Sequence, residues 1–544
     1  MRTHTRRTVL GASIAVAGSG LLAACSDSGS RSRSGPRSGS LPDGGLGPGG
    51  QIIEPFVPRG PKGYVEPSGP EVLAAEKKRG GGSVHRVELT ATRTPIDLGG
   101  RTVTSWAYGD SLPGKEVRCT AGDILEISLA NHLPESTTLH SHGIRLRCDM
   151  DGVPDLTQRP IKPGEDFLYR FAVEHPGTYW LHSHSGMQLD RGLYAPLIVE
   201  DPKESLSYDR EWVVVIDDWV DGVDGSTPDG VLAQLGGGMD MGGEGGDDHS
   251  RHGSGHESSD RKKSAGPSRV LRGSHSRLLH GMGGAVNYPF YLINGRLPTA
   301  PSEFRARPGD RIRLRIINAG GETAFRVSLG GHEMTVTHTD GYPVRHTKTD
   351  ALLIGMAERY DVCITAKDGV FPLVALAEGK KDAALALLRT GGGTAPKYGV
   401  RPSELNRKLV PARRLVPDES VALSRRKPDH ELRLRLTGNM RKFNWSFDHT
   451  PYRLSQRHPI RFGDRIRLTV INATDMWHPI HLHGHTFALA GIDSIGARKD
   501  TAPVLPHRKL VMDFDADNPG LWMLHCHNQY HSESGMMTNL GYLK

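Results

Sequence analysis

Residues 463–472 read Gly-Asp-Arg-Ile-Arg-Leu-Thr-Val-Ile-Asn. After the Gly-Asp turn, polar and apolar residues alternate, which is the periodicity of a half-buried strand. The same pattern runs from Gly122 to Asn131 and from Gly309 to Asn318, and in all three copies the Asn follows the Gly by nine residues. A repeat of this kind predicts three all-β domains of one design, each large enough for a small Greek-key β-sandwich.

The two outer copies share histidine pairs that the middle copy lacks. Nine and eleven residues after the Asn, each outer copy has a His-x-His pair, and a second pair lies near the end of each outer copy. At the matching positions the middle copy has Val327 and Leu329, then Val374 and Leu376. Residues two apart on a strand point to the same face, so four pairs can converge between the outer domains. The pairs are His140 and His142, His182 and His184, His481 and His483, and His525 and His527.

The last histidine pair encloses a cysteine, and this cysteine helps to choose the metal. Neutral imidazole binds copper, zinc and iron alike. Together, His478, Cys526, His531 and Met536 offer two imidazoles, one thiolate and one weak axial sulfur, which is the ligand set of a blue-copper centre. Since Ser183 stands at the position that matches Cys526 in the first copy, we expect the blue centre in the third domain only.

These motifs resemble those of three-domain multicopper oxidases, the group of laccases and bacterial cuprous oxidases, and most of all those of actinobacterial lipoprotein members associated with copper tolerance. The resemblance covers roughly residues 84–544. It implies cupredoxin-like domains, four copper ions, and transfer of electrons from a donor to dioxygen, which is reduced to water. By position, it assigns His140 and His481 to the type 2 copper, His142, His182, His184, His483, His525 and His527 to the two type 3 coppers, and His478, Cys526, His531 and Met536 to the type 1 copper.

Reduction of dioxygen also needs protons, and the resemblance points to acidic residues. Asp151, nine residues after His142, matches an acid near the cluster of similar enzymes, although it could equally be a turn residue before Gly152. A second acid often follows the second blue-copper histidine directly, but here that position is Ser532 and Glu533 comes one residue later. We take Cys526, Asp151 and Glu533 as the catalytic candidates.

The N-terminus has the features of an export signal. Arg6-Arg7 precede a short apolar stretch that ends at Cys25, an arrangement that resembles a Tat-type lipoprotein signal over residues 1–25. It predicts a lipid anchor at Cys25 on the outer face of the cytoplasmic membrane; the alternative is a cleaved signal with an incidental cysteine. Residues 26–82 are rich in Ser, Gly, Arg and Pro and predict a flexible tether.

The repeats predict cupredoxin domains over 83–203, 204–392 and 429–544, with a linker at 393–428. The second domain contains a Gly-rich insertion, 235–284, that holds several His and Met and predicts a mobile loop. It either recruits copper ions or is an inert solvated loop. Of the five cysteines, Cys119 and Cys148 are either bridged or separate thiols.

The pattern as a whole predicts an oxidase that takes electrons from Cu(I), Fe(II) or phenols and serves copper detoxification. The alternatives are a lipoprotein that sequesters copper without turnover and a general laccase acting on phenols. Storage needs no electron-transfer thiolate, which favours the enzyme. Most of the net charge of +7 comes from six arginines in the first 40 residues, so we expect no nucleic-acid partner, and we expect a monomer.

Overall fold

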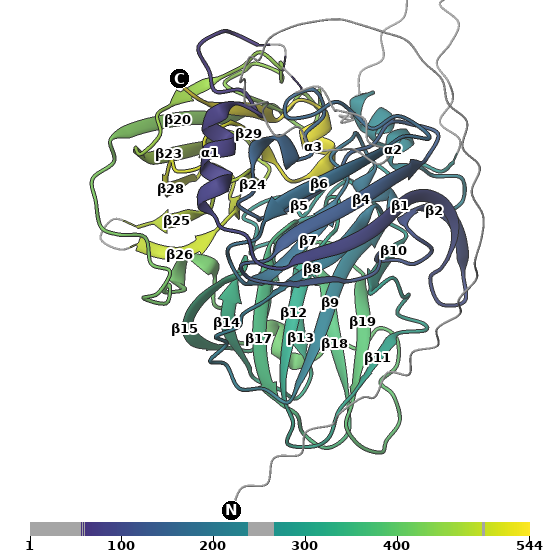
Figure 1. Ribbon diagram of the computed structural model, residues 1–544. Coiled ribbons are helices and arrows are strands. Elements are labelled where there is room, and N and C mark those ends of the chain that lie inside the picture. Colours follow the sequence, from purple (N-terminus) through teal and green to yellow (C-terminus); the bar gives the residue numbers. More distant parts are fainter. Residues whose placement is uncertain (1–55, 57, 59, 238–265, 492–494) are drawn as a thin grey trace, which may run out of the picture. The chain divides into compact units, whose positions relative to one another are not determined.

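The computed structural model describes residues 56, 58, 60–237, 266–491 and 495–544 (Figure 1). Six sheets, which the chain forms in three consecutive pairs, dominate the regular secondary structure of this part of the protein. No helix in the described residues has the length and apolar character needed to cross a membrane. The helical elements are α1 (Pro70–Lys78), α2 (Pro228–Gly236), α3 (Gln529–Glu533) and the short 3-10 turns η1 (Cys148–Met150), η2 (Leu189–Arg191), η3 (Ser403–Asn406) and η4 (Ala412–Arg414).

The first domain is a pair of four-stranded sheets that share one hydrophobic core. Leu89 and Ile127 from one sheet and Leu181 and Leu197 from the other belong to the same buried cluster. The first sheet has the order β2-β1-β4-β6, with β1 (Val84–Asp97), β2 (Thr102–Tyr108), β4 (Ile124–His132) and β6 (Asp166–Ala172). The second has the order β3-β8-β7-β5, with β3 (Val117–Thr120), β5 (His140–His142), β7 (Gly177–His182) and β8 (Tyr194–Glu200).

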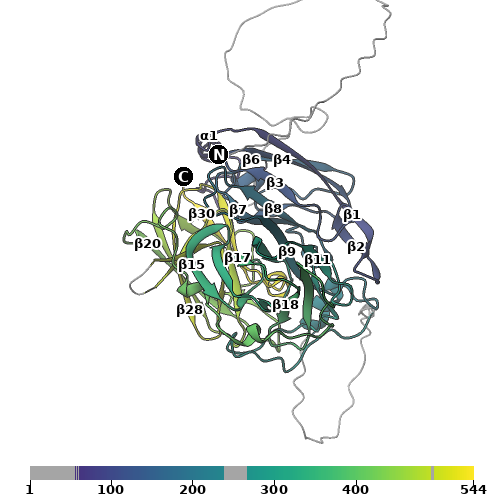
Figure 2. The same ribbon diagram turned by 90° about the horizontal axis from the view of Figure 1, so that it is seen from below.

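The middle domain repeats this design with a six-stranded and a five-stranded sheet. The larger sheet has the order β10-β9-β12-β17-β14-β15, with β9 (Arg210–Trp219), β10 (Phe290–Ile293), β12 (Arg311–Asn318), β14 (Met334–Thr339), β15 (Tyr342–Thr349) and β17 (Arg359–Thr365). The smaller has the order β11-β19-β18-β13-β16, with β11 (Ser302–Arg305), β13 (Phe325–Leu329), β16 (Leu352–Ile354), β18 (Val370–Ala377) and β19 (Ala383–Arg389). Strand β7 of the first domain contacts β12 and β17, and Figure 2 shows β7 near β17.

The third domain also has a six-stranded and a five-stranded sheet. The larger sheet has the order β21-β20-β23-β28-β25-β26, with β20 (His430–Thr437), β21 (Ser446–Phe447), β23 (Arg465–Asn472), β25 (Phe487–Ala490), β26 (Ile495–Lys499) and β28 (Lys509–Asp515). The smaller has the order β22-β30-β29-β24-β27, with β22 (His458–Ile460), β24 (His478–Leu482), β27 (Thr501–Val504), β29 (Leu521–Cys526) and β30 (Met537–Tyr542).

The repeated asparagine has the same structural role in all three domains. Asn131, Asn318 and Asn472 are buried near the ends of the repeated strands β4, β12 and β23. Each side chain donates two hydrogen bonds to backbone carbonyls and accepts one from a backbone N–H two residues on. A buried amide with its hydrogen bonds made fixes the loop that leads to the next strand, which explains why the motif recurs.

That loop is one residue longer in the middle domain. Asn318 donates to the carbonyl of Thr323, five residues on, whereas the outer asparagines donate to carbonyls four residues on. The left-handed glycine after the next strand is accordingly Gly331, the counterpart of Gly143 and Gly484. Strand register agrees, because Ser328 pairs with Val374 as His140 pairs with His182.

The predicted match of Val327 and Leu329 to the first histidine pairs is therefore wrong by one residue. Ser328 and Gly330 occupy those positions. The interpretation is unchanged, because neither residue is a histidine and the middle domain still lacks the pair.

The segment predicted as a flexible tether is folded in its last third, which is a correction to the expectation for 26–82. Helix α1 lies between the outer domains, where Glu76 accepts a hydrogen bond from the backbone of Ala172 and Arg79 donates to Asn518 at 2.6 Å (Figure 1). The backbone N–H of Val65 donates to the carbonyl of Tyr542. Apolar Val65 and Val72, both buried, supply the packing that the overall composition of the segment conceals.

The described part of the 235–284 insertion is likewise packed rather than mobile. Residues 235 and 236 end α2, and residues 266–284 contact the middle domain, where Ser276 donates to Glu378 at 2.6 Å and Leu279 is buried. Met239, Met241, His249, His252 and His256 lie outside the described residues, as does Cys25. Cys119 and Cys148 are separate buried thiols.

Candidate metal centres

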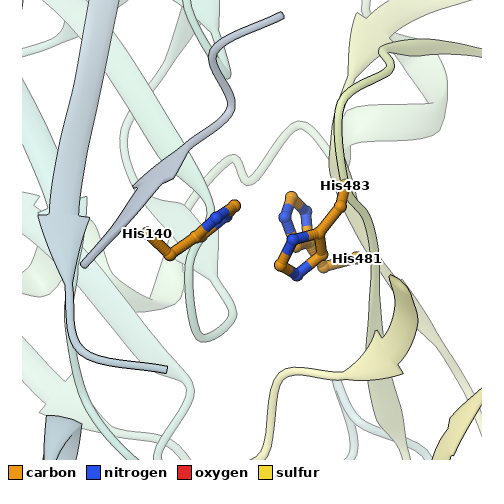
Figure 3. A group of neighbouring side chains, drawn as sticks. All are labelled: His140, His481 and His483. Carbon is orange, nitrogen blue, oxygen red and sulfur yellow. The ribbon is translucent and has the colours of Figure 1, made fainter. Parts of the chain in front are cut away.

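Eight histidines from the two outer domains converge on one buried region, which we call the histidine cluster. They are His140, His142, His182, His184, His481, His483, His525 and His527. Strands β5 and β7 present the first-domain pairs, and β24 and β29 present the third-domain pairs. Figure 3 shows His140 facing His481 and His483 across the boundary between these domains. A site of this kind exists only when the first and third domains are in contact.

Strand pairing sets the geometry of the cluster. On antiparallel strands His140 stands opposite His182, and His481 stands opposite His525. The second member of each of the last three pairs lies just beyond the end of its strand. The sequence repeat thus becomes an approximate symmetry, with two histidine pairs contributed from each side.

Six of the eight rings of the cluster have at least one buried nitrogen without a protein partner. Burial without a hydrogen bond is costly for a polar atom, so a group of such atoms that face one another fits a bound metal. The nitrogens without a partner are Nε2 of His140, His182, His184 and His481, Nδ1 of His142, and both nitrogens of His527. Nε2 of His483 and Nε2 of His525 face each other at 3.1 Å, and with His184 they form one candidate three-histidine metal group.

In six of the eight rings the other nitrogen lies within hydrogen-bonding distance of an oxygen atom, as in metal sites where outer partners orient the ligands. Asp151 lies between the domains: its backbone carbonyl is 2.7 Å from Nδ1 of His140, and its carboxylate is 2.9 Å from Nδ1 of His483. The carboxylate is fully buried, and one of its oxygens has no hydrogen-bond partner. Asp151 is therefore more than a turn residue, since it contacts a candidate ligand from each outer domain.

A second carboxylate in the same region was not predicted from the sequence. Asp500 precedes β27, and its Oδ1 lies 3.0 Å from Nε2 of His142 while its backbone carbonyl lies 2.9 Å from Nδ1 of His481. Arg359 and the two rings hold the pKa of Asp500 well below its ordinary value, against the effect of burial. Asp500 belongs to no His-x-His motif and lies 19 residues after His481, so no local signal identifies it.

The residues predicted for the blue-copper centre form a separate group. Sγ of Cys526 lies 3.6 Å from Nδ1 of His478 and 3.8 Å from Nδ1 of His531, and the two Nδ1 atoms are 3.1 Å apart. Three donor atoms at these distances fit the trigonal His₂Cys arrangement of a blue-copper site. Thr474 contacts Nε2 of His478 at 2.9 Å, and the Trp445 ring packs against both imidazoles.

Met536, the predicted axial ligand, is joined to this group through its backbone, and Met537 lies in a different environment. Met536 is fully buried, and its backbone carbonyl accepts the N–H of Cys526. Met537, by contrast, begins β30, pairs with His525 and is partly exposed. The two side chains therefore occupy different environments.

Burial keeps the candidate ligands ready to bind a metal. It lowers the pKa of His184 and His478 to about 3, and it holds the pKa of His182, His525 and His531 well below the ordinary value. These rings are neutral at pH 7, which is the form that coordinates metals. The same burial raises the pKa of the Cys526 thiol, whereas a coordinated metal would deprotonate it.

Glu533 lies apart from the histidine cluster. It is on α3, directly after Ser532, and among the described residues it makes no hydrogen bond to a candidate ligand. Burial raises the pKa of Glu533 to about 7. Ser532, at the position where similar enzymes often have an acid, places its hydroxyl 3.5 Å from Nδ1 of His525.

His478 is fully buried and has no exposed edge. Part of the insertion lies close by. A Cβ atom at Gly281 would lie 2.9 Å from the backbone carbonyl oxygen of Asp475, the residue after Thr474. Met282 is partly buried against the core. The described end of the insertion therefore approaches the loop that carries Thr474 and Asp475.

Comparison with known proteins identifies the class. Three domain models described as multicopper oxidase match residues 90–204, 271–393 and 425–542. The multicopper oxidase MmcO of Mycobacterium tuberculosis is 48% identical over 464 residues, which cover 84% of this chain and 87% of that protein. Copper resistance protein A of Escherichia coli is 28% identical, covering 82% and 91%. The chain belongs to the multicopper oxidase family, as its motifs predicted, and is a copper-binding oxidoreductase.

Solved structures agree on the fold. Fet3p, a multicopper oxidase that functions in iron import, has a TM-score of 0.68 at 22% identity and covers 85% of this chain and 90% of its own. The laccase from Botrytis aclada has a TM-score of 0.64 at 24% identity, covering 85% and 88%. These likenesses confirm the prediction of an all-β protein built from cupredoxin-like domains.

Proposed function

We propose that the protein couples one-electron oxidation of a small donor to the four-electron reduction of dioxygen to water, using four copper ions. The observation that carries the proposal is the position of Cys526 between His525 and His527, because one tripeptide supplies a ligand atom to the blue-copper group and two rings to the histidine cluster. A copper store would not need this connection. When bound, copper supplies reversible one-electron transfer and binding of dioxygen.

The proposed ligand assignment follows the sequence motifs. His478, Cys526, His531 and Met536 would hold the type 1 copper, His140 and His481 the type 2 copper, and His142, His182, His184, His483, His525 and His527 the type 3 pair. In support, the two proposed type 2 ligands each have a buried Nε2 without a protein partner. Bonds along the chain from Cys526 to its neighbouring histidines offer the electron a short covalent route.

We assign proton delivery to Asp151, with Glu533 as the second candidate. Asp151 is buried between His140 and His483, so its carboxylate can pass a proton to the space that these rings enclose. A carboxyl group whose pKa is raised to about 7, as in Glu533, exchanges protons at neutral pH. Glu533 would act at the surface end of such a route, because it does not contact the cluster.

Cu(I) is the donor that we favour, in a role in copper detoxification. A phenol must reach the imidazole edge, but His478 is fully buried. The insertion contains sulfur and imidazole, both ligands for Cu(I), and a related protein is a copper resistance protein. Export and a lipid anchor at Cys25 would place the reaction outside the cytoplasm.

Oxygen uptake by the copper-loaded protein tests the function. We expect uptake with Cu(I) at a higher kcat/KM than with Fe(II) or 2,6-dimethoxyphenol, and a gain with the phenol when residues 238–265 are deleted. Binding of copper without oxygen uptake from any donor would favour the storage alternative. Efficient turnover of the phenol by the intact chain, with none of Cu(I), would favour a general laccase.

Replacement of Met536 by leucine is expected to raise the potential of the type 1 copper. Leucine is close in volume but lacks the weak sulfur donor that favours Cu(II). The rise should be on the order of 100 mV, since each tenfold change in relative affinity for the two oxidation states is about 59 mV for one electron. Redox titration measures it, and Met537→Leu is the matched control. A shift in the Met537 variant alone would move the axial ligand by one residue.

Replacement of Cys25 by alanine is expected to release the protein from membranes. Lipidation of a bacterial lipoprotein occurs on the cysteine at its cleavage site, so the variant should be recovered as a soluble or uncleaved species. Cell fractionation with detection of the full chain measures the change, and Cys363→Ala is the control. Unchanged recovery with membranes in the Cys25 variant would contradict the anchor.

A further inference from the structure

The middle domain binds none of the proposed coppers, yet one of its arginines reaches the histidine cluster. Arg359, the first residue of β17, is fully buried. Its Nη1 and Nη2 donate to the two carboxylate oxygens of Asp500 at 2.7 and 2.6 Å. Oδ1 of Asp500 is also 3.0 Å from Nε2 of His142. A single carboxylate of the third domain therefore contacts a side chain from each of the other two domains.

The contacts of Asp500 decide which nitrogen of two rings faces the metal. Because Nε2 of His142 is occupied by the carboxylate, Nδ1 is the nitrogen left without a partner. Nδ1 of His481 is occupied by the backbone carbonyl of Asp500, which leaves Nε2. The two rings stack with centroids 3.8 Å apart. A shift of Asp500 would therefore disturb a proposed type 3 ligand and a proposed type 2 ligand together.

Arg359 is itself fixed by several contacts from around it. Its backbone N–H donates to Asp340, and its Nε donates to the carbonyl of Thr178 in the first domain. Asp340 also accepts the backbone N–H groups of Asp500 and Thr501. A guanidinium held in this way has little freedom to rotate, so it can define where the Asp500 carboxylate lies.

The surrounding charges indicate a role beyond stability. Lys499 lies 3.2 Å from Asp340 and 3.0 Å from Glu358. With Arg359 and Asp500, these residues form a group of two cations and three carboxylates that is almost fully buried. Replacing buried ion pairs with well-packed apolar residues is often neutral or stabilising. Stability alone therefore does not explain why five charged groups meet beside the histidine cluster.

We propose that Arg359 is a positioning residue through which the copper-free middle domain fixes the rings of His142 and His481 by way of Asp500. The inference rests on the proposed function, since it takes these two histidines as copper ligands. Its two-point contact matters: lysine would keep the charge but could not grip both oxygens in the same plane.

The test uses Arg359→Met and Arg359→Lys in the full-length, copper-loaded protein. The readouts are copper content after dialysis against a chelator and the electron paramagnetic resonance of the type 2 copper, with the blue absorption of the type 1 copper as internal reference. Changes in outer partners of metal ligands typically weaken metal binding 10–100-fold. We expect a loss of that size at the cluster in the Met variant, a smaller one in the Lys variant, and retention of the blue absorption in both.

Arg313→Met is the matched control. Arg313 lies on β12 of the same domain and is buried, and its Nε and Nη2 both donate to Oδ2 of the buried Asp361 carboxylate, at 3.0 and 2.6 Å. It contacts no proposed ligand. We expect its removal to leave the type 2 signal intact. Should the Arg359→Met chain not fold, Arg359→Lys decides, since its charge is retained.

A double variant tests whether Arg359 acts through Asp500. Adding Arg359→Lys to the Asp500→Asn variant should cause no further loss of copper from the cluster, because the effects of two residues that act one through the other are not additive. Additive losses of copper, or type 2 signals in the Arg359 variants that equal those of the Arg313 control, would overturn this inference but not the proposed function. A wild-type protein that shows neither blue nor type 2 copper would overturn the proposed function, and this inference with it.

Discussion

Replacing Cys526 with serine is expected to abolish both the blue absorption and the oxidase turnover while the protein remains folded. The blue colour comes from the copper–thiolate bond, and a hydroxyl is a poor copper ligand at neutral pH. Serine is close in size to cysteine, and the site is buried beside Ile480 in strand pairing, so the fold should persist. Copper analysis should show one ion fewer per chain.

Absorption spectra, copper content and oxygen uptake of the same preparation measure this change. Cys363→Ser is the control, because Cys363 is a half-buried free thiol on β17 that contacts no proposed ligand. It should leave colour and turnover as they are. A blue, active Cys526→Ser protein would remove the central assignment of this site.

Replacing Asp151 with asparagine is expected to lower kcat by about 10²–10⁴-fold, the usual contribution of a positioned acid or base. Asparagine keeps the backbone carbonyl that faces His140 and the overall shape of the side chain, so the coppers should remain bound. What is lost is the ability to hold and release a proton. Turnover should therefore fall while the blue absorption of the resting protein stays.

Steady-state oxygen uptake and copper content measure the effect, and Asp149→Asn is the matched control. Asp149 lies two residues earlier on η1, is paired with Arg147 at 2.7 Å, and contacts no candidate ligand. Its variant should turn over normally. Wild-type turnover in a fully copper-loaded Asp151→Asn protein would exclude Asp151 as a proton donor. Loss of copper together with turnover would assign it a purely orienting role.

The sequence predicted the sandwiches and the grouping of the histidines because both follow from local periodicity. Alternation marks a strand, and a His-x-His pair on a strand has one facing direction, so the spacing alone places His140 and His142 on a common face. The one-residue shift in the middle domain shows where matching positions by counting residues from the Asn fails. One extra residue after Asn318 shifts the match by one without changing any motif.

What could not be predicted depends on contacts between distant parts of the chain. Asp500 and Arg359 carry no motif, and their relation appears only when three domains meet. Composition also misled where a few apolar residues decide the structure, as with Val65 and Val72 in the predicted tether.

The separation of 358 residues between His142 and Asp500 has a consequence for how the protein is made. During synthesis the first domain can fold alone, but half of the histidine cluster is still untranslated until the final part of the chain leaves the ribosome. Contacts so far apart in sequence form late and slowly. Copper loading of the cluster is thus possible only after translation is complete, and a chain that stops before residue 527 would be left with unpaired first-domain histidines.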